Sequence, residues 1–173
     1  IFMTDNGHPF NGIYNAGMRG SKGSPYQGGT RVPSFWRWPG VLPRGVDVDK
    51  LAAHVDILPT LAELAGAAPP PGVKLDGRSL VPLLRNHDAP WPDRFLVTHV
   101  GRWDRGQAAA AQFRQCSIRD SQFRLVNNTE LYDLKKDPAE SRNVLEDHPE
   151  VVKRLRKAYD EWWREVLPAL ENE

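Results

Sequence analysis

The sequence predicts an α/β protein in two parts. Short apolar runs separated by glycine- and proline-rich stretches occupy the first 93 residues, and four closely spaced strand patterns followed by an amphipathic helix pattern occupy the rest. Short apolar runs bounded by turn residues are typical of strands, whereas apolar residues at three- and four-residue steps are typical of a helix. We therefore predict an α/β part over residues 1–93 and, over residues 94–173, a small antiparallel sheet packed with a C-terminal helix.

The composition excludes several classes of function. Lys and Arg together number 23 and Asp and Glu 22, so the charge balance gives no reason to expect binding to nucleic acid or to a membrane surface. The single cysteine, Cys116, excludes an internal disulfide. Because no run of about 18 apolar residues occurs, we predict no membrane span.

The first part begins with two predicted strands. Residues 1–4 are an apolar run that predicts a buried strand, and residues 31–38 predict a second strand that ends at Pro39-Gly40. Residues 5–30 are rich in Gly, Asn, Ser and Pro, which predicts a loop. Because the chain opens inside a buried strand, we expect the natural protein to continue upstream, and we expect an exposed sheet edge to allow self-association.

A helix is predicted next, from Asp56 as N-cap, through Pro59 in the first turn, to Gly66 as its stop. Residues 67–72 contain three consecutive prolines and predict an extended linker. The turn at 76–79 leads to a short apolar helix or turn over 80–84, and 86–93 form a second loop.

The second part begins with four predicted strands, over residues 95–100, 112–118, 123–126 and 130–134, with Asn127-Asn128 as a hairpin turn. Asp147 and Glu150 resemble a capping box, which predicts the start of the last helix. One apolar stripe faces the sheet and a charged face is solvated. The predicted stripe is Val152, Leu155, Tyr159, Trp162 and Val166.

The densest polar chemistry lies in the opening loop. Asp5 and Asn6 supply a carboxylate and an amide oxygen directly after a strand, and both are ligands that Ca²⁺ accepts. Lys22 lies among glycines, where backbone N–H groups and an ammonium group can together hold an anion. From the residues alone, Thr4 to Gly7 also fits a turn with an Asx hydrogen bond, and Lys22 also fits a solvated side chain.

These segments, with several later motifs, resemble the C-terminal portion of a formylglycine-dependent, arylsulfatase-like sulfatase of the alkaline-phosphatase superfamily. The matching segments follow the family order over nearly the whole chain. They are Thr4-Asp5-Asn6-Gly7, Arg19 to Pro33, Trp38-Pro39-Gly40, His54 to Leu61, Asp76 to Leu80, and Glu130 to Leu134 with Asp137-Pro138. The resemblance implies that residues 1–93 form the C-terminal part of an alkaline-phosphatase-like sheet and that the parent protein hydrolyses sulfate esters.

The resemblance also implies roles for individual residues. Asp5 and Asn6 match the pair that binds the active-site divalent cation, with Ca²⁺ as the expected ion, and Lys22 matches the lysine that contacts the substrate sulfate. Gln27 stands where the family commonly has Glu. His8 is outside the family pattern, and it is a candidate substrate contact or merely part of the loop.

Other polar residues have weaker functional patterns. His99 and Arg102 follow a predicted strand and are candidates for lining a substrate pocket. His54 and Asp56 are explained by capping at a helix start. Cys116 lies in a strand pattern and is expected to be a buried thiol, and the Trp162-Trp163 pair is expected in the helix core or an interface.

The nucleophile of the family is missing from this chain. It comes from a Cys or Ser followed by x-Pro-x-Arg, which is converted to formylglycine, and no cysteine or serine here begins that pattern. We therefore expect the formylglycine upstream, and we expect this chain alone to hydrolyse nothing. Two alternatives stay open: a phosphonate monoester hydrolase or phosphodiesterase of the same superfamily, and a non-catalytic binding module. The expected substrate is a sulfated small molecule or carbohydrate, and the family implies a periplasmic or secreted location.

Overall fold

The computed structural model describes residues 1–9, 14–68 and 71–170 and forms two compact units. Unit 1 contains residues 1–5 and 34–94, and unit 2 contains residues 6–33 and 95–173. The sequence-based division placed residues 6–33 with the first part, whereas in the structure they pack with the C-terminal sheet. Residues 10–13 of the predicted loop and 69–70 of the predicted linker lie outside the described residues.

Unit 1 begins with a two-stranded ribbon. Strand β1 (Phe2–Met3) pairs antiparallel with β2 (Ser34–Phe35), so that Phe2 lies opposite Phe35. The prediction of a buried strand over 1–4 is wrong for this structure, because Phe2 is 63% and Phe35 65% exposed. The strand predicted over 31–38 is likewise reduced to two residues. A ribbon of two short strands provides no second layer that could cover its apolar side chains.

The helical part of unit 1 follows the predicted order. A 3₁₀ turn, η1 (His54–Asp56), leads into α2 (Ile57–Leu64), and α3 (Val81–Arg85) follows further along. The predicted stop at Gly66 is confirmed: its φ is +67°, and the N–H groups of Gly66 and Ala67 donate to the carbonyls of Glu63 and Ala62. This is the hydrogen-bond pattern of a Schellman C-cap.

Asp56 occupies the predicted N-cap position of α2, but its side chain makes no capping bond to that helix. The carboxylate is fully buried and accepts hydrogen bonds from the N–H groups of Ala53 and Arg78 and from the Arg94 guanidinium at 2.8 Å. A buried charge needs such partners. Asp56 therefore links η1, the turn before α3 and the end of unit 1.

Unit 2 contains an antiparallel sheet in the order β3 (Leu96–His99), β4 (Cys116–Arg119), β5 (Phe123–Val126) and β6 (Glu130–Asp133). The hairpin turn is confirmed, because Asn127 and Asn128 have φ values of 49° and 61°, and Asn tolerates this conformation well. The strand predicted over 112–118 begins only at Cys116. A 3₁₀ turn, η2 (Ala109–Ala111), and a positive φ at Phe113 and Gln115 precede it.

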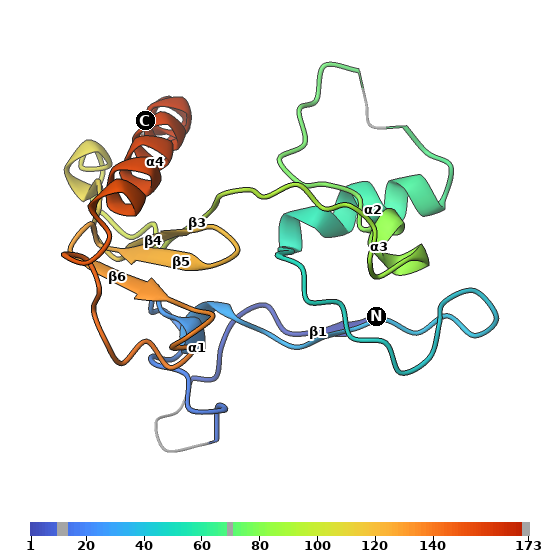
Figure 1. Ribbon diagram of the computed structural model, residues 1–173. Coiled ribbons are helices and arrows are strands. Elements are labelled where there is room, and N and C mark those ends of the chain that lie inside the picture. Colours follow the sequence, from blue (N-terminus) through green and yellow to red (C-terminus); the bar gives the residue numbers. More distant parts are fainter. Residues whose placement is uncertain (10–13, 69–70, 171–173) are drawn as a thin grey trace. The chain divides into compact units, whose positions relative to one another are not determined.

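Helix α4 (Pro149–Leu170) lies along one face of this sheet (Figure 1). Its core contacts come from Val152, Leu155, Tyr159 and Trp163, which pack on Cys116, Ile118, Phe123, Leu125 and Leu131. The predicted stripe differs at two positions, because Trp162 and Val166 are only partly buried and Trp163 is buried instead. The capping box is also wrong: the helix begins at Pro149, and Asp147 pairs with Arg142 at 3.1 Å instead.

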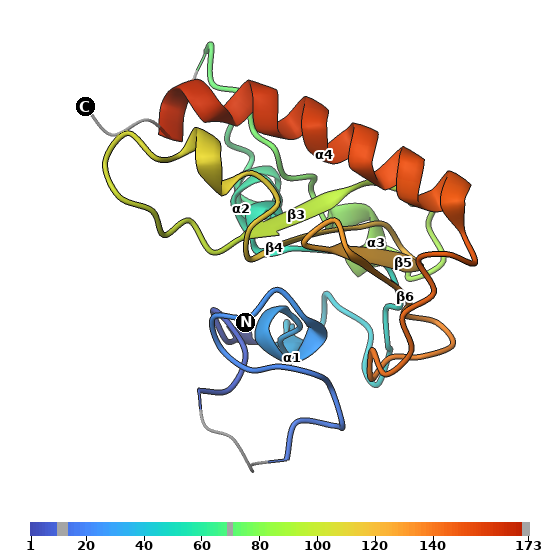
Figure 2. The same ribbon diagram turned by 90° about the vertical axis from the view of Figure 1, so that its left-hand side faces the viewer.

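The opposite face of the sheet is covered by the opening loop and its short helix α1 (Gln27–Thr30) (Figure 2). The sequence predicts a loop throughout residues 5–30, and this prediction is wrong over residues 27–30, which form α1. Unit 2 is thus a sheet between two covering layers, α4 and the segment that carries Lys22. Within the described part of the chain, no helix combines the length and apolar composition needed to cross a bilayer.

Candidate functional site

Lys22 lies in a closed turn of the opening loop. The Ser24 N–H donates to the Ser21 carbonyl at 2.9 Å, and the Ser21 N–H donates to the Ser24 hydroxyl at 3.2 Å. The Lys22 N–H donates to the carbonyl of His8 at 2.9 Å, so its backbone is held to the segment that follows the Asp-Asn pair. The side chain of Lys22 is exposed. The turn therefore presents an ammonium group from a backbone fixed on two sides.

Two glycines allow the loop to close on itself. The Gly28 N–H donates to the Arg19 carbonyl at 2.7 Å. A Cβ on Gly28 would lie 2.2 Å from the carbonyl oxygen of Gly20, and one on Gly29 would lie 2.2 Å from that of Ser24. Such backbone contacts leave no room for a side chain. The Gly28-Gly29 pair is thus needed for close approach of α1 to the Lys22 turn.

The segment from Asn6 to His8 lies beside this turn. The Gly7 N–H donates to the Gly29 carbonyl at 3.0 Å, and His8 accepts the bond from Lys22. Asn6 and His8 are half-buried. The structure therefore brings the main chains of His8 and Lys22 together in unit 2, which also contains Asn6, whereas Asp5, which is exposed, is the last residue of the first segment of unit 1.

Asp5 and Asn6 have the right type of donor atom for a hard cation, but two side chains provide too few ligands. Their carboxylate and amide oxygens are the donors that Ca²⁺ prefers, yet Ca²⁺ takes six to eight such oxygens. Within the described residues, no group of three or more His, Cys, Asp or Glu side chains could hold a metal ion. The pair can therefore supply only part of a cation site.

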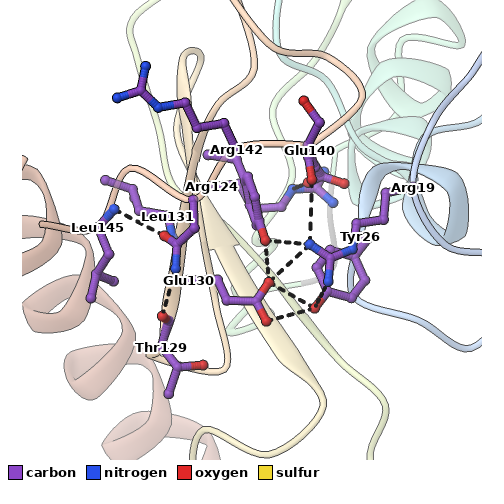
Figure 3. A network of polar contacts seen from close by, with 12 residues as sticks. Arg19, Tyr26, Arg124, Thr129, Glu130, Leu131, Glu140, Arg142 and Leu145 are labelled. Carbon is purple, nitrogen blue, oxygen red and sulfur yellow. Dashed lines mark hydrogen bonds and ion pairs between the residues drawn. The ribbon is translucent and has the colours of Figure 1, made fainter. Parts of the chain in front are cut away.

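The loop is attached to the sheet by a polar cluster at the rim. Arg19 donates to the Glu130 carboxylate at 3.2 Å and to the Tyr132 hydroxyl, and Tyr26 donates to Glu130 at 3.0 Å. The Arg19 guanidinium also lies over the Tyr26 ring, 4.1 Å from its centroid. Figure 3 shows Arg19 and Tyr26 pointing toward Glu130 of β6. These contacts connect the residue three positions before Lys22 to the edge of the sheet.

A second attachment is buried. Arg124 of β5 is 2% exposed and Glu140 is 0% exposed, and their charged atoms lie 3.5 Å apart. Arg124 donates to the Pro25 carbonyl at 2.9 Å and to the Thr30 hydroxyl at 3.0 Å. Glu140 accepts from the Gln27 N–H at 2.7 Å. Both residues of the pair thus contact the segment directly after Lys22.

Burial dominates the ionisation of this pair. Desolvation lowers the pKa of Arg124 to about 10, although the nearby Glu140 charge opposes the shift. Desolvation also raises the pKa of Glu140 above its usual range, against the effects of Arg124 and of the Gln27 N–H. Within the described residues, Arg124 Nε and Glu140 Oε1 have no hydrogen-bond partner. Arg124 Nε and Glu140 Oε1 therefore form an ion pair without a hydrogen bond, while other polar atoms of the two side chains hydrogen-bond to the loop.

Neither Arg124 nor Glu140 was among the site residues predicted from the sequence. Arg124 could have been noticed as a charged residue between Phe123 and Leu125 in a strand pattern whose other residues are apolar. Glu140 gives no such signal, because its partners Gln27 and Arg124 are distant in the sequence. Its role depends on tertiary packing that no local pattern reports.

His99 lies away from these attachments, on the side of the sheet covered by α4. The His99 ring stacks on Trp163 with centroids 5.1 Å apart. Its Nε2 lies 3.1 Å from the Ala111 carbonyl, and its Nδ1 lies 3.1 Å from the Gly101 N–H. Burial lowers its pKa. Both ring nitrogens are thus engaged in the neutral tautomer with Nε2–H, while Arg102 is exposed; their substrate role stays a prediction.

Cys116 is the buried thiol that the sequence predicted. It is 1% exposed and packs in the core beneath α4. Burial raises the pKa of the thiol, against the effect of a hydrogen bond with Tyr159. A neutral buried thiol is a poor nucleophile, so Cys116 acts as a core residue.

Comparison with known proteins agrees with the motif order. Residues 21–164 match the family described as N-sulphoglucosamine sulphohydrolase, C-terminal. Human arylsulfatase A is 35% identical over 186 residues, which cover 91% of this chain and 36% of that protein. A sulfatase of Formosa agariphila is 33% identical over 159 residues, which cover 86% of this chain and 29% of that protein.

A solved structure supports the same assignment. The crystal structure of Ps i-CgsB is 26% identical and superposes with a TM-score of 0.75, covering 93% of this chain and 35% of that chain. The chain spans about a third or less of the length of the first curated relatives, from 13% for rat steryl-sulfatase to 32% for human arylsulfatase D. Motifs, fold and family match agree, and the chain belongs to the sulfatase family, with the C-terminal sulfatase fold of the alkaline-phosphatase-like type.

Proposed function

We propose that this chain is the C-terminal segment of an enzyme that hydrolyses sulfate esters, and that Lys22 contacts the sulfate group. The observation that carries the proposal is the closed turn around Lys22, which is bonded to the His8 carbonyl directly after the Asp-Asn-Gly segment. An ammonium group on a backbone fixed in this way can hold the anionic group of a substrate.

Lys22 has a simple chemical role in this proposal. Its side chain is a compact positive charge with three donors, and it extends from a fixed backbone into solvent. During hydrolysis, negative charge spreads over the sulfate oxygens and the leaving oxygen. A fixed cation that contacts a sulfate oxygen stabilises that charge more in the transition state than in the bound substrate.

Asp5 and Asn6 would contribute two oxygen ligands to a divalent cation, expected to be Ca²⁺. Such an ion would supply positive charge that polarises the sulfate group. The remaining ligands and the formylglycine nucleophile would come from segments outside this sequence. Since two side-chain oxygens make a weak site, the isolated chain should bind Ca²⁺ with a Kd of about 1 mM or weaker by calorimetry. Micromolar binding by the chain alone would contradict a divided site.

The substrate class proposed is a sulfated carbohydrate. The structure of Ps i-CgsB has also been determined in complex with k-i-k-neocarrahexaose. The match with that protein covers 93% of the present chain at 26% identity. His8, beside Lys22, and His99 and Arg102 stay predicted substrate contacts. A panel of sulfated oligosaccharides, aryl sulfates, steryl sulfates and phosphonate monoesters, assayed with the natural full-length protein, tests this choice. A preference for phosphonate monoesters would contradict sulfatase activity.

The direct test of the site is Lys22→Ala in the natural full-length protein that contains this chain. Loss of one charge-stabilising donor should lower kcat by about 10²- to 10³-fold. Lys135→Ala is the matched control, because Lys135 is also an exposed lysine of unit 2 but lies just after β6. Unchanged kcat in Lys22→Ala would remove this residue from the site.

The isolated chain gives a second test. Without a nucleophile it should show no turnover of an aryl sulfate at any Ca²⁺ concentration. A robust rate from the purified chain that disappears on chelation would overturn the proposal that its reactive half lies elsewhere.

A further inference from the structure

The Lys22 turn is the tip of a loop with both of its ends attached to the C-terminal sheet. Arg19, three residues before Lys22, contacts Glu130 and Tyr132 of β6. Pro25 and Gln27, three and five residues after Lys22, contact Arg124 and Glu140. The two ends are also joined to each other, because the Gly28 N–H donates to the Arg19 carbonyl.

Most of these attachments are directional. Arg124 donates to two loop oxygens, the Pro25 carbonyl and the Thr30 hydroxyl, and its second terminal nitrogen lies 3.4 Å from Gln27 Oε1. Glu140 accepts from the main-chain N–H of Gln27. Bonds to main-chain atoms fix the position of the backbone itself, whatever the side chains do.

A buried ion pair is not the simplest way to stabilise this layer. Removing two charges from water costs more than the pair recovers unless the geometry is very good, and apolar residues of similar volume are often as stable. The other face of the same sheet is closed with apolar side chains. What the pair supplies here is a fixed arrangement of donors and an acceptor against the segment after Lys22.

We propose that Arg124 and Glu140 are positioning residues for Lys22, acting through the main chain of residues 25–27, with Arg19 and Glu130 as a second attachment at the rim. This inference rests on the proposed role of Lys22 in sulfate-ester hydrolysis. The C-terminal sheet layer thereby becomes part of the active-site architecture. It sets where the ammonium group stands, and it does so without touching the substrate.

Hydrogen exchange in the 173-residue chain tests the attachment without any assay of activity. Glu140→Ala should speed exchange of the Lys22 and Gly28 amides about tenfold, the effect expected from loss of a buried hydrogen bond to a charged group. Glu140→Gln should restore part of the protection, because its amide oxygen can still accept from the Gln27 N–H. Unchanged exchange in Glu140→Ala would overturn the proposal.

Asp120→Ala is the matched control for general destabilisation. Asp120 is also a buried carboxylate of unit 2 paired with an arginine, Arg154, but that arginine belongs to α4 on the opposite face. Asp120→Ala should leave the exchange rates of the Lys22 and Gly28 amides close to those of the unsubstituted chain. Equal acceleration in Asp120→Ala and Glu140→Ala would mean that the loop reports stability alone, and would contradict positioning. If Glu140→Ala does not fold, Arg19→Met at the partly exposed rim replaces it.

Kinetics of the natural full-length protein test the consequence. Glu140→Ala should lower kcat about tenfold with little change in KM, since a misplacement of about 1 Å can cost up to a hundredfold. Glu140→Gln should recover part of kcat, and Asp120→Ala should not change it. A parent protein without sulfatase activity would contradict the proposed function, and the exchange comparison would still decide whether the pair holds the loop.

Discussion

The two faces of the sheet in unit 2 are closed differently: the α4 face by an apolar core, and the loop face by a small apolar cluster (Val126, Tyr132 and Leu134 with Tyr26) together with buried charges. On the α4 face, Leu125 and Ile118 meet Leu155, Tyr159 and Trp163 in an apolar core. On the loop face, Arg124 alternates with these core residues along β5 and meets Glu140 and the main chain of the Lys22 loop. Both faces bury their side chains.

This difference suggests that the two faces have different roles: one stabilises the sheet, and the other positions the Lys22 loop. Apolar contacts are strong but not directional, so helix α4 stabilises the sheet and tolerates small shifts. Hydrogen bonds to main-chain atoms add less net free energy but fix one geometry. We infer that the sheet is held together from the α4 face and that it holds the candidate site from the loop face.

The largest expected effect is on the α4 face. Trp163→Ala should reduce the free energy of unfolding of unit 2 by about 4 kcal/mol, because it removes a large buried side chain that stacks on His99 and Tyr159. Exchange of the slowest amides of β5 measures this loss. A loss below about 1 kcal/mol would contradict the assignment of this face as the source of stability.

Gly28→Ala should have the next largest effect, and on the loop face. Its new Cβ would lie 2.2 Å from the Gly20 carbonyl oxygen, so the loop must open. We expect a loss of about 1–3 kcal/mol, as for other overpacked sites, with the faster exchange concentrated in residues 19–30. Gly106→Ala is a control at a glycine with nothing within 4 Å but a positive φ of 73°. If Gly28→Ala spreads its effect evenly over the sheet, the loop does not act as a separate layer.

Removing one hydroxyl from each face gives a finer comparison. Tyr132→Phe deletes the contacts with Arg19 and Glu130, and Tyr159→Phe deletes the bond accepted from the Phe113 N–H at 3.1 Å and the bond with the Cys116 thiol. Each should cost about 1 kcal/mol in urea unfolding. Only Tyr132→Phe should change exchange in the Lys22 turn. The same exchange pattern in both variants would remove the distinction between the faces.

The smallest effect is the pH dependence of Glu140. Since burial raises the pKa of Glu140 above 4.5, this group contributes stability that is fully present below pH 4.5 and is lost as pH rises through the folded-state pKa. Glu140→Gln should therefore be at least as stable as the parent at pH 7 and should lose that advantage near pH 4.5. Unfolding in urea at both pH values measures the difference. If the stability of the parent relative to Glu140→Gln increased as the pH rises, this result would contradict a raised pKa of Glu140.

Features set by local sequence could be predicted. The Asn127-Asn128 turn, the stop at Gly66 and the amphipathic character of α4 follow from conformations and periodicities that short segments determine. The predicted cap of α4, Asp147, lies two residues before the first helical residue, Pro149, and it pairs with Arg142 rather than capping the helix. The buried strand over 1–4 was wrong because burial depends on covering layers that a short segment does not report.

The candidate site divides in the same way. Asp5, Asn6, His8 and Lys22 stand out as polar residues in a glycine-rich loop, and the family resemblance implies roles for Asp5, Asn6 and Lys22. Arg124 was detectable only as a charge within an apolar strand pattern, and neither residue could be linked to the loop, because their loop partners Pro25 and Gln27 lie about 100 residues away in the sequence. The candidate site residues of the loop could thus be predicted from the sequence, whereas the residues that attach the loop to the sheet became apparent only from the packing.

The central claim is that Glu140 acts through Lys22, and a double-mutant cycle tests it most directly. In the natural full-length protein, kcat/KM for an aryl sulfate is measured for the parent, Glu140→Ala, Lys22→Ala and the double variant. If Glu140 only positions Lys22, then Glu140→Ala lowers kcat/KM about tenfold in the parent and has almost no further effect once Lys22 is removed. Equal tenfold losses in both backgrounds would contradict the account.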